Sequence, residues 1–324
     1  MSSKSARFHP FYDPHSHNGG LSNGIKALIS LGLGAVYGAA QFVTMPNRAA
    51  FYSENCLILA AIITTAVMAL YLATDVFRES LDTVDKFYGS DEITSQIVDH
   101  WLSDKQFYLA GSAGAVANMA VAHVLGIPGE FHIAYSSLVV MYSGYLISGF
   151  AAGMGLLAII AVIALYLKLA PSLEQALDPK DPDGNGGIKR LGDALWFFAT
   201  LIAALAVLIC IYMFGVSWQS IHQPAVRIVF IFWISLPFLV AMSIVLIPGL
   251  AVRRHVGHYK IRHESQLKQE KAELYSSFKQ FKNVDDEDII SSKKELSEKL
   301  TEISVQMEQL RKMRKSHIDG REDT

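Results

Sequence analysis

Residues 133–167, IAYSSLVVMYSGYLISGFAAGMGLLAIIAVIALYL, contain no Asp, Glu, Lys or Arg. A helix crosses the hydrocarbon core of a bilayer with about 20 apolar residues, so this run exceeds what one crossing needs. One helix over 133–168 would be about 54 Å long at about 1.5 Å per residue. The run therefore predicts a long tilted helix that projects past the bilayer, a helix bent near SGFAAGMG (148–155), or a hairpin of two short passes.

Five more stretches lack charged residues, and together with the first they define the class of the protein. They are 27–47, 55–74, 107–129, 194–226 and 228–252. Only 18% of the chain is charged, against about 25% in soluble domains. The sequence thus predicts an all-α, polytopic membrane protein with about six transmembrane helices, at about 25–45, 55–74, 107–127, 133–168, 195–217 and 228–250. The first of them contains Gly34-xxx-Gly38, a spacing that lets two helices approach closely. Pro248-Gly249 is expected to close the sixth.

Lysine and arginine predict the orientation. With six spans both ends of the chain share one side, which holds the cations before the first span, those of 75–105, those of 168–190 and the basic tail. The other side receives only Arg48 and Arg227. Positive residues accumulate in the cytoplasm, so both termini are expected there. The expected parts are a polar segment 1–23, a transmembrane domain 24–252 and a cytoplasmic domain 253–324.

The parts outside the spans are expected to be helical. Residues 75–105 repeat apolar positions at helical spacing, with Gly89-Ser90-Asp91 between two short amphipathic helices. These helices would lie on the membrane or on neighbouring helices, or would receive a ligand or a partner subunit. In the tail, apolar residues alternate spacings of four and three, which is the seam of a coiled coil: Leu296, Leu300, Ile303, Met307 and Leu310. The tail is expected to be a helical hairpin or a bundle formed with other subunits.

A basic segment, RRHVGHYKIRH (253–263), follows the last span directly and contains no acid. Its four cations are Arg253, Arg254, Lys260 and Arg262. Basic residues beside a span usually meet anionic lipid headgroups, and recognition of a phosphate-bearing ligand is the alternative.

The loop DPDGNGGIKRLGD (181–193) has part of the pattern of a calcium loop. Asp181, Asp183 and Asn185 occupy its first, third and fifth positions, but Gly192 stands where the bidentate glutamate is required. Tight calcium binding is therefore not expected. Asp-Pro, Asp-Gly and Gly-Gly are strong turn formers, so the loop is either a turn into the fifth span or a weak ion site. A cation would use the oxygens named above, and an anion would use backbone amides with Lys189 and Arg190.

No catalytic motif is present, so we expect no enzyme, and no cofactor apart from a weakly held Ca²⁺ at 181–193. The spans carry no charge in their interiors, which disfavours proton or sodium coupling. Uncharged polar residues could line a pore or mediate tight helix packing. The candidates are Ser112, Asn118 and His123 in the third span, and Ser136, Tyr142, Ser143 and Ser148 in the fourth.

The motif DPDGNGGI (181–188), followed by Leu191-Gly192 and by Trp196 at the start of a span, resembles bacterial multi-span membrane proteins with a PDGxGG-type loop. The general layout is also similar to the channel-forming effectors, protein A, of the Hailong anti-phage defence system. This resemblance implies an ion-channel domain in the bacterial inner membrane. It also implies a crown domain that binds single-stranded DNA oligomers, made by a partner nucleotidyltransferase, and holds the channel closed. The crown would come from 75–105, 255–317 or the projecting part of the fourth run.

The sequence and this resemblance together lead us to expect a homo-oligomeric, ligand-gated channel in contact with membrane lipid. A tetramer is our hypothesis for the assembly, because the sequence does not give the number of subunits. Two other classes remain open: a non-conducting scaffold or sensor that recruits a soluble partner through its coiled coil, and a secondary transporter.

Overall fold

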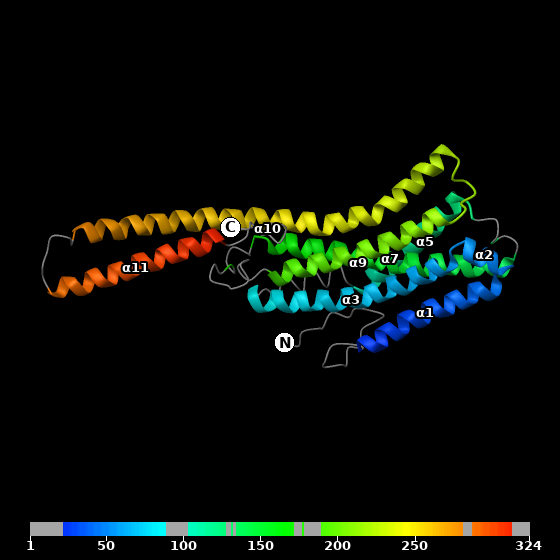
Figure 1. Cartoon of the computed structure of the whole chain (residues 1–324), viewed down its shortest axis with the longest axis horizontal. Coiled ribbons are helices and arrows are strands. Elements are labelled where there is room, and N and C mark those ends of the chain that lie inside the picture. The colour runs from blue at the N-terminus through cyan, green and yellow to red at the C-terminus, as the bar shows by residue number, and fades with distance from the viewer. Residues whose placement is uncertain are drawn as a thin grey trace. The chain divides into compact units, whose positions relative to one another are not determined.

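The computed structural model describes residues 22–88, 103–127, 131, 134–171, 177, 189–280 and 287–312. Within these ranges all regular secondary structure is helical (Figure 1). The helices are α1 (Asn23–Thr44), α2 (Arg48–Ser53), α3 (Cys56–Tyr88), α5 (Asp104–Leu125), α7 (Tyr135–Leu169), α9 (Lys189–Gly215), α10 (Pro224–Gln280) and α11 (Glu287–Lys312).

The described residues include 6 helices long and apolar enough to cross a membrane, as the charge-free runs predict. These are α1, α3, α5, α7, α9 and α10, and they indicate a multi-pass membrane protein. The 133–168 run forms one continuous helix, α7, so the alternative of a hairpin with two short passes is wrong. The segment 148–155 lies within this helix.

Two helices are longer than the spans predicted for them. Residues 75–88 continue α3 instead of forming a separate amphipathic helix, because no glycine or proline interrupts the chain before Gly89. Likewise, α10 continues to Gln280, and Pro248-Gly249, which we expected to close the sixth span, lies inside the helix. Proline is tolerated within membrane helices because neighbouring groups satisfy the freed carbonyls. Residues 89–102, and with them most of the second expected helix, lie outside the described residues.

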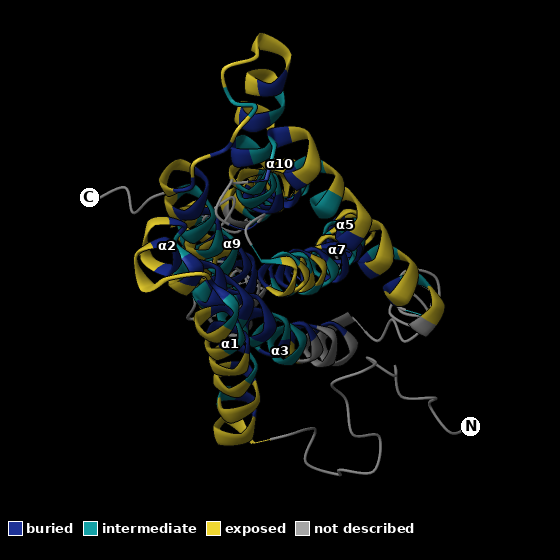
Figure 2. Cartoon of the chain, turned by 90° about the vertical axis from the view of Figure 1, so that its right-hand side faces the viewer, coloured by how far each residue is buried: buried dark blue, intermediate teal, exposed yellow. Residues whose placement is uncertain are grey.

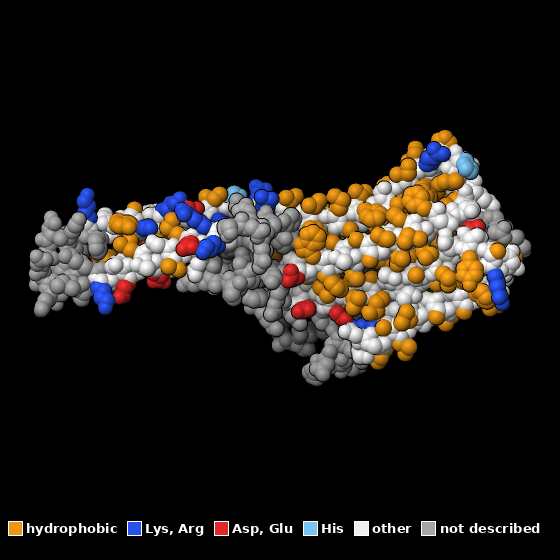
Figure 3. Space-filling model, in the orientation of Figure 1, with side chains coloured by type: hydrophobic (Ala, Val, Ile, Leu, Met, Phe, Trp, Pro, Cys, Tyr) orange, Lys and Arg blue, Asp and Glu red, His pale blue; other side chains and the backbone are white. Residues whose placement is uncertain are grey.

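The chain divides into two compact units. The bundle unit comprises residues 1–85, 90–165 and 194–245, and the tail unit comprises 86–89, 166–193 and 246–324. In the bundle unit, α1, α3, α5, α7 and α9 run alongside one another (Figure 1). On the face drawn in Figure 3, hydrophobic side chains cover the bundle unit, whereas Lys, Arg, Asp and Glu gather along α11 and the C-terminal half of α10.

Close contact between α1 and α3 depends on a glycine. A Cβ atom added to Gly34 would lie 2.9 Å from the carbonyl oxygen of Ala60 on α3, and Gly38 faces the same alanine. The expected close approach at Gly34-xxx-Gly38 is therefore confirmed. At the end of this contact Lys26 of α1 forms an ion pair with Asp75 of α3, and the Lys26 side chain is only 6% exposed.

Glycines also bring α5 and α7 together, backbone against backbone. A Cβ atom on Gly114 of α5 would lie 2.7 Å from Cα of Gly153. A Cβ atom on Gly149 would lie 2.7 Å from Cβ of Asn118. The segment 148–155, where a bend was one of the predicted alternatives, is thus the surface of α7 on which α5 packs.

In the tail unit, α11 packs on the C-terminal part of α10. Leu267, Ile303 and Leu310 form a buried cluster, with Leu274 and Met307 packed against it. Polar contacts join the same two helices: Lys260 Nζ donates to the carbonyl of Arg311 at 3.2 Å, and Lys271 Nζ donates to Ser304 Oγ at 3.1 Å. The apolar positions predicted for a coiled-coil seam include three of these residues.

Candidate functional site

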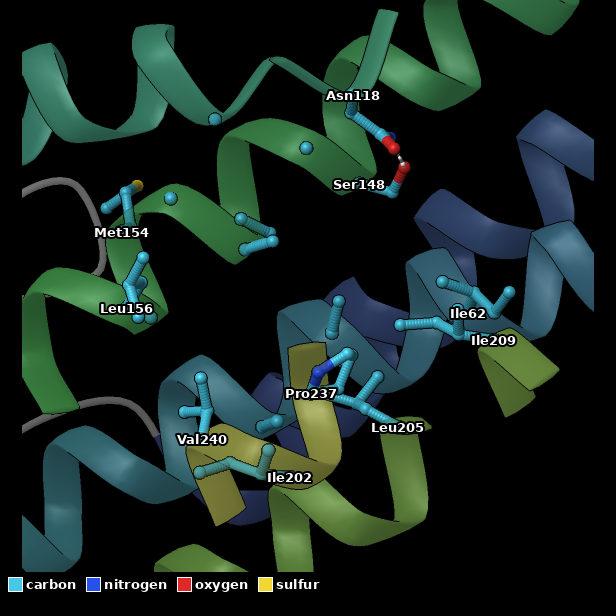
Figure 4. Close-up of a pocket in the computed structure, with 18 of the residues that line it drawn as sticks. Ile62, Asn118, Ser148, Met154, Leu156, Ile202, Leu205, Ile209, Pro237 and Val240 are labelled. Carbon is cyan, nitrogen blue, oxygen red and sulfur yellow. Dashed lines mark hydrogen bonds between the residues drawn. The ribbon is translucent and has the colours of Figure 1, made fainter. Parts of the chain in front are cut away.

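A cavity of about 420 Å³ lies in the bundle unit, between α3, α5, α7, α9 and α10. Figure 4 shows Ile62, Ile202, Ile209 and Val240 among the apolar side chains around it. None of the lining residues carries a charge. The volume falls within the range of about 300–1,000 Å³ typical of sites for small molecules.

Two of the seven predicted pore residues lie on the wall of this cavity and bind each other. Asn118 Nδ2 on α5 donates to Ser148 Oγ on α7 at 3.1 Å and to the carbonyl of Tyr145 at 2.8 Å (Figure 4). Ser148 Oγ in turn donates to the same carbonyl, at 3.3 Å. The pair therefore joins two helices and also presents polar atoms beside an otherwise apolar space.

A pair of phenols on the cavity wall was not predicted from the sequence. The hydroxyl oxygens of Tyr145 on α7 and Tyr212 on α9 lie 2.6 Å apart, and both side chains are buried. Trp218 packs edge-on against Tyr212 and donates from Nε1 to the carbonyl of Met213 at 2.9 Å. Tyr212 and Trp218 lie near the end of the fifth span, where such residues are usually interfacial anchors, and Tyr145 lies within the fourth span. Only the packing shows that these three residues turn inward.

The outer face of α5 carries two more of the predicted pore residues. Ser112 and His123 are exposed, together with Lys105. Separations of seven and eleven residues correspond to about two and three helical turns, so the three side chains share one face. Figure 2 shows exposed residues along α5 and α1. We call the exposed residues Lys105, Leu109, Ser112, Val116, Ala120 and His123 the α5 outer face.

The remaining predicted pore residues are on α7 and do not reach the cavity. Ser136 and Ser143 are exposed, and Ser143 Oγ donates to the carbonyl of Val140 at 2.6 Å. Tyr142 is half-buried and packs against the core of the bundle. The seven candidates therefore fall into an inner pair at the cavity, exposed pairs on α5 and on α7, and the half-buried Tyr142.

The predicted ligand-binding cations differ in their exposure and in the helix that carries them. Arg253, Arg254 and Arg262 are exposed on α10, whereas Lys260 is half-buried and binds the end of α11. Lys189 and Arg190 form the first turn of α9. The proposed calcium ligands Asp181, Asp183 and Asn185 lie outside the described residues.

Two buried charges at the ends of the spans were missed. The sequence contains a pattern that could have predicted the Lys26–Asp75 pair. Lys26 immediately precedes one charge-free run and Asp75 immediately follows the next. In an antiparallel helix pair, both residues therefore lie at the same end. Glu54 is 4% exposed and accepts a hydrogen bond from the backbone amide of Ser217, 3.4 Å away. No pattern in the sequence connects Glu54 with Ser217.

No protein-family model, curated protein or solved structure matches the chain.

Proposed function

We propose that the protein is a subunit of a homo-oligomeric, ligand-gated ion channel of the bacterial inner membrane. The observation that carries this proposal is the position of α5. Its most apolar stretch has a mean hydropathy of 1.3, the lowest of the six spans, and yet only 22% of that stretch is buried, also the lowest share. A helix that faced lipid would be expected to be the more apolar one, so a second protein surface or water is the better neighbour for this face.

The chemistry of the α5 outer face fits a pore between copies of the chain. Ser112 and His123 offer a hydroxyl and an imidazole, while Leu109 and Val116 on the same face could close a narrow passage by dewetting. Copies arranged around an axis, with four as our proposal, would bring these faces together. The six charge-free runs support passive conduction over coupled transport, because coupled transporters place charged residues within their spans.

The gating ligand in this proposal is the single-stranded DNA oligomer implied by the resemblance, supplied by a partner nucleotidyltransferase in an anti-phage defence system. Its phosphates would meet the tail unit, a cytoplasmic helical hairpin of α10 and α11. Exposed Arg253, Arg254 and Arg262 support this assignment, because guanidinium groups bind phosphate oxygens in a bidentate geometry.

Ion flux from liposomes containing the purified protein tests the proposal, measured with and without single-stranded DNA oligomers. We expect flux that DNA suppresses, and a severalfold lower flux for Ser112→Leu. The matched control is Thr200→Leu, which replaces an exposed hydroxyl residue on α9 and should leave the flux unchanged.

Each outcome of this experiment has a distinct meaning. Flux that DNA does not change would support the channel and contradict the proposed ligand. Equal flux from both variants would show that α5 does not line the pore. An intact oligomer that conducts under no condition would favour the alternative, a scaffold that recruits a soluble partner through the tail unit.

A further inference from the structure

The cavity of the bundle unit has a lining that selects against charged ligands. Its described walls come from five helices, and none of the described lining residues is Asp, Glu, Lys, Arg or His. Moving an ionised group into such a space costs far more than moving a neutral one, because no counter-charge replaces its hydration. A cavity lined mainly by apolar side chains is filled favourably by an apolar molecule.

The phenol pair leaves one hydroxyl proton with no acceptor among the described residues. Tyr145 and Tyr212 each bear a hydroxyl proton, but only one of the two protons can lie between oxygens 2.6 Å apart. The second proton points elsewhere, and both residues line the cavity. A buried donor without an acceptor is costly, so a ligand that brings a neutral acceptor oxygen gains affinity there.

We propose that this cavity binds a neutral amphiphile, with an apolar chain along the α3, α9 and α10 walls and an acceptor oxygen, such as an ester carbonyl, at the Tyr145–Tyr212 pair. Asn118 and Ser148 form a second polar position on the α5 and α7 side. The site is separate from the α5 outer face, so the inference does not depend on ion conduction.

Tryptophan fluorescence reports on this cavity directly. Trp218 and Trp233 both line it, and Trp101 and Trp196 are the other two of the four tryptophans. In a Trp101→Phe/Trp196→Phe background, the probe is the methyl ester of a bromine-substituted fatty acid, whose bromine quenches tryptophan on contact. We expect saturable quenching by the ester and none that saturates with the corresponding free acid, measured at a pH where the acid is ionised.

Two variants test the location. Gly155 lines the cavity, and a Cβ atom there would meet only Leu70 Cδ2, at 3.8 Å, so Gly155→Leu fills the space without a backbone clash. It should abolish saturable quenching. Gly32→Leu is the matched control, because a Cβ on Gly32 of α1 has nothing within 4 Å, and this variant should quench like the parent.

The double variant Tyr145→Phe/Tyr212→Phe removes both donors together and leaves no orphaned partner. We expect ester affinity to fall by about tenfold, the value of one hydrogen bond to a neutral group. This variant and the comparison of ester with acid keep the test decisive if Gly155→Leu does not fold. Quenching that never saturates and is equal in all variants would show partition into detergent only and overturn the proposal. Equal binding of ester and acid would overturn the ligand class.

Discussion

Lys26 and Asp75 show how an ion pair is accommodated at the end of a membrane bundle. Lys26 is nearly inaccessible, while the Asp75 side chain is 36% exposed, so water still screens one partner. Such a pair adds little net stability compared with apolar residues, but breaking it leaves an ammonium group buried alone.

Asp75→Asn is expected to destabilise the bundle unit by about 1–3 kcal/mol, the cost of a buried group without its partner. Thermal unfolding in detergent, followed by the fluorescence of the protein, measures this loss. Adding Lys26→Met to Asp75→Asn removes the orphaned charge and should restore most of the stability. A double variant as unstable as the single one would show that the charge is not the cause.

Gly149→Ala is expected to cost about 1–3 kcal/mol, because the added methyl group meets Asn118 Cβ at 2.7 Å and must push α5 away from α7. The same substitution at Gly32, where the added methyl group has open space, should leave stability unchanged or raise it slightly. Equal melting temperatures for the two variants would contradict the close packing of α5 and α7.

At the scale of the helix, the sequence predicted where the spans begin more reliably than where they end. The spans follow from the exclusion of charge by the bilayer, which a single sequence displays directly. The ends of α3 and α10 were placed too early, because the more polar segment that follows each span keeps the same helical period as the span before it. Proline at position 248 was also taken as a stop, although a membrane helix can contain it.

The candidate site was predicted only in part for a related reason. Composition identified Asn118 and Ser148 as unusual residues in apolar helices, and both lie at the cavity. Whether a serine faces a cavity, a neighbouring helix or the exterior depends on how the helices are rotated, and the even apolar character of α7 leaves that rotation undefined. The Tyr145–Tyr212 contact joins residues 67 positions apart, and no local pattern signals it.

Leu310→Ala in α11 is expected to weaken the packing of α11 on α10 by about 2–5 kcal/mol, since Leu310 is 1% exposed in that cluster. Amide hydrogen exchange over 294–312 should become faster. Val305→Ala, which truncates a side chain 49% exposed on the same helix, should leave exchange unchanged. Similar exchange in both variants would place α11 away from α10 in solution.

Protonation should also loosen α11. Hydrogen bonds from Lys299 and Lys312 lower the pKa of Glu295 and Glu308 below their ordinary values. A carboxyl group with a lowered pKa contributes stability above its unfolded pKa and loses it as the pH falls through the folded value. Protection of α11 from exchange, corrected for the intrinsic rate, should therefore decline slightly below about pH 4.3. In Lys299→Gln/Lys312→Gln this decline should be smaller, and an unchanged decline would exclude these pairs as its cause.

At the scale of the whole molecule, the proposed oligomer would bring the α5 outer faces of its subunits together. In a Cys210→Ala background the remaining cysteine, Cys56, is only 1% exposed. Val116→Cys places a thiol on the α5 outer face, where the valine is 67% exposed, and mild oxidation in membranes should join chains of 35.7 kDa into dimers. Val43→Cys on α1, at a valine 80% exposed, is the control and should stay monomeric on a non-reducing gel. Dimers from Val43→Cys alone would move the contact between copies to α1.

The cavity also makes the protein sensitive to hydrostatic pressure. A folded bundle that holds about 420 Å³ open occupies more volume than one in which the helices have closed over that space. Compression favours the smaller state, in proportion to the void that is eliminated. An occupied cavity contains no void that compression could eliminate. A bound amphiphile would therefore keep the same helix arrangement at pressures at which the empty bundle would collapse.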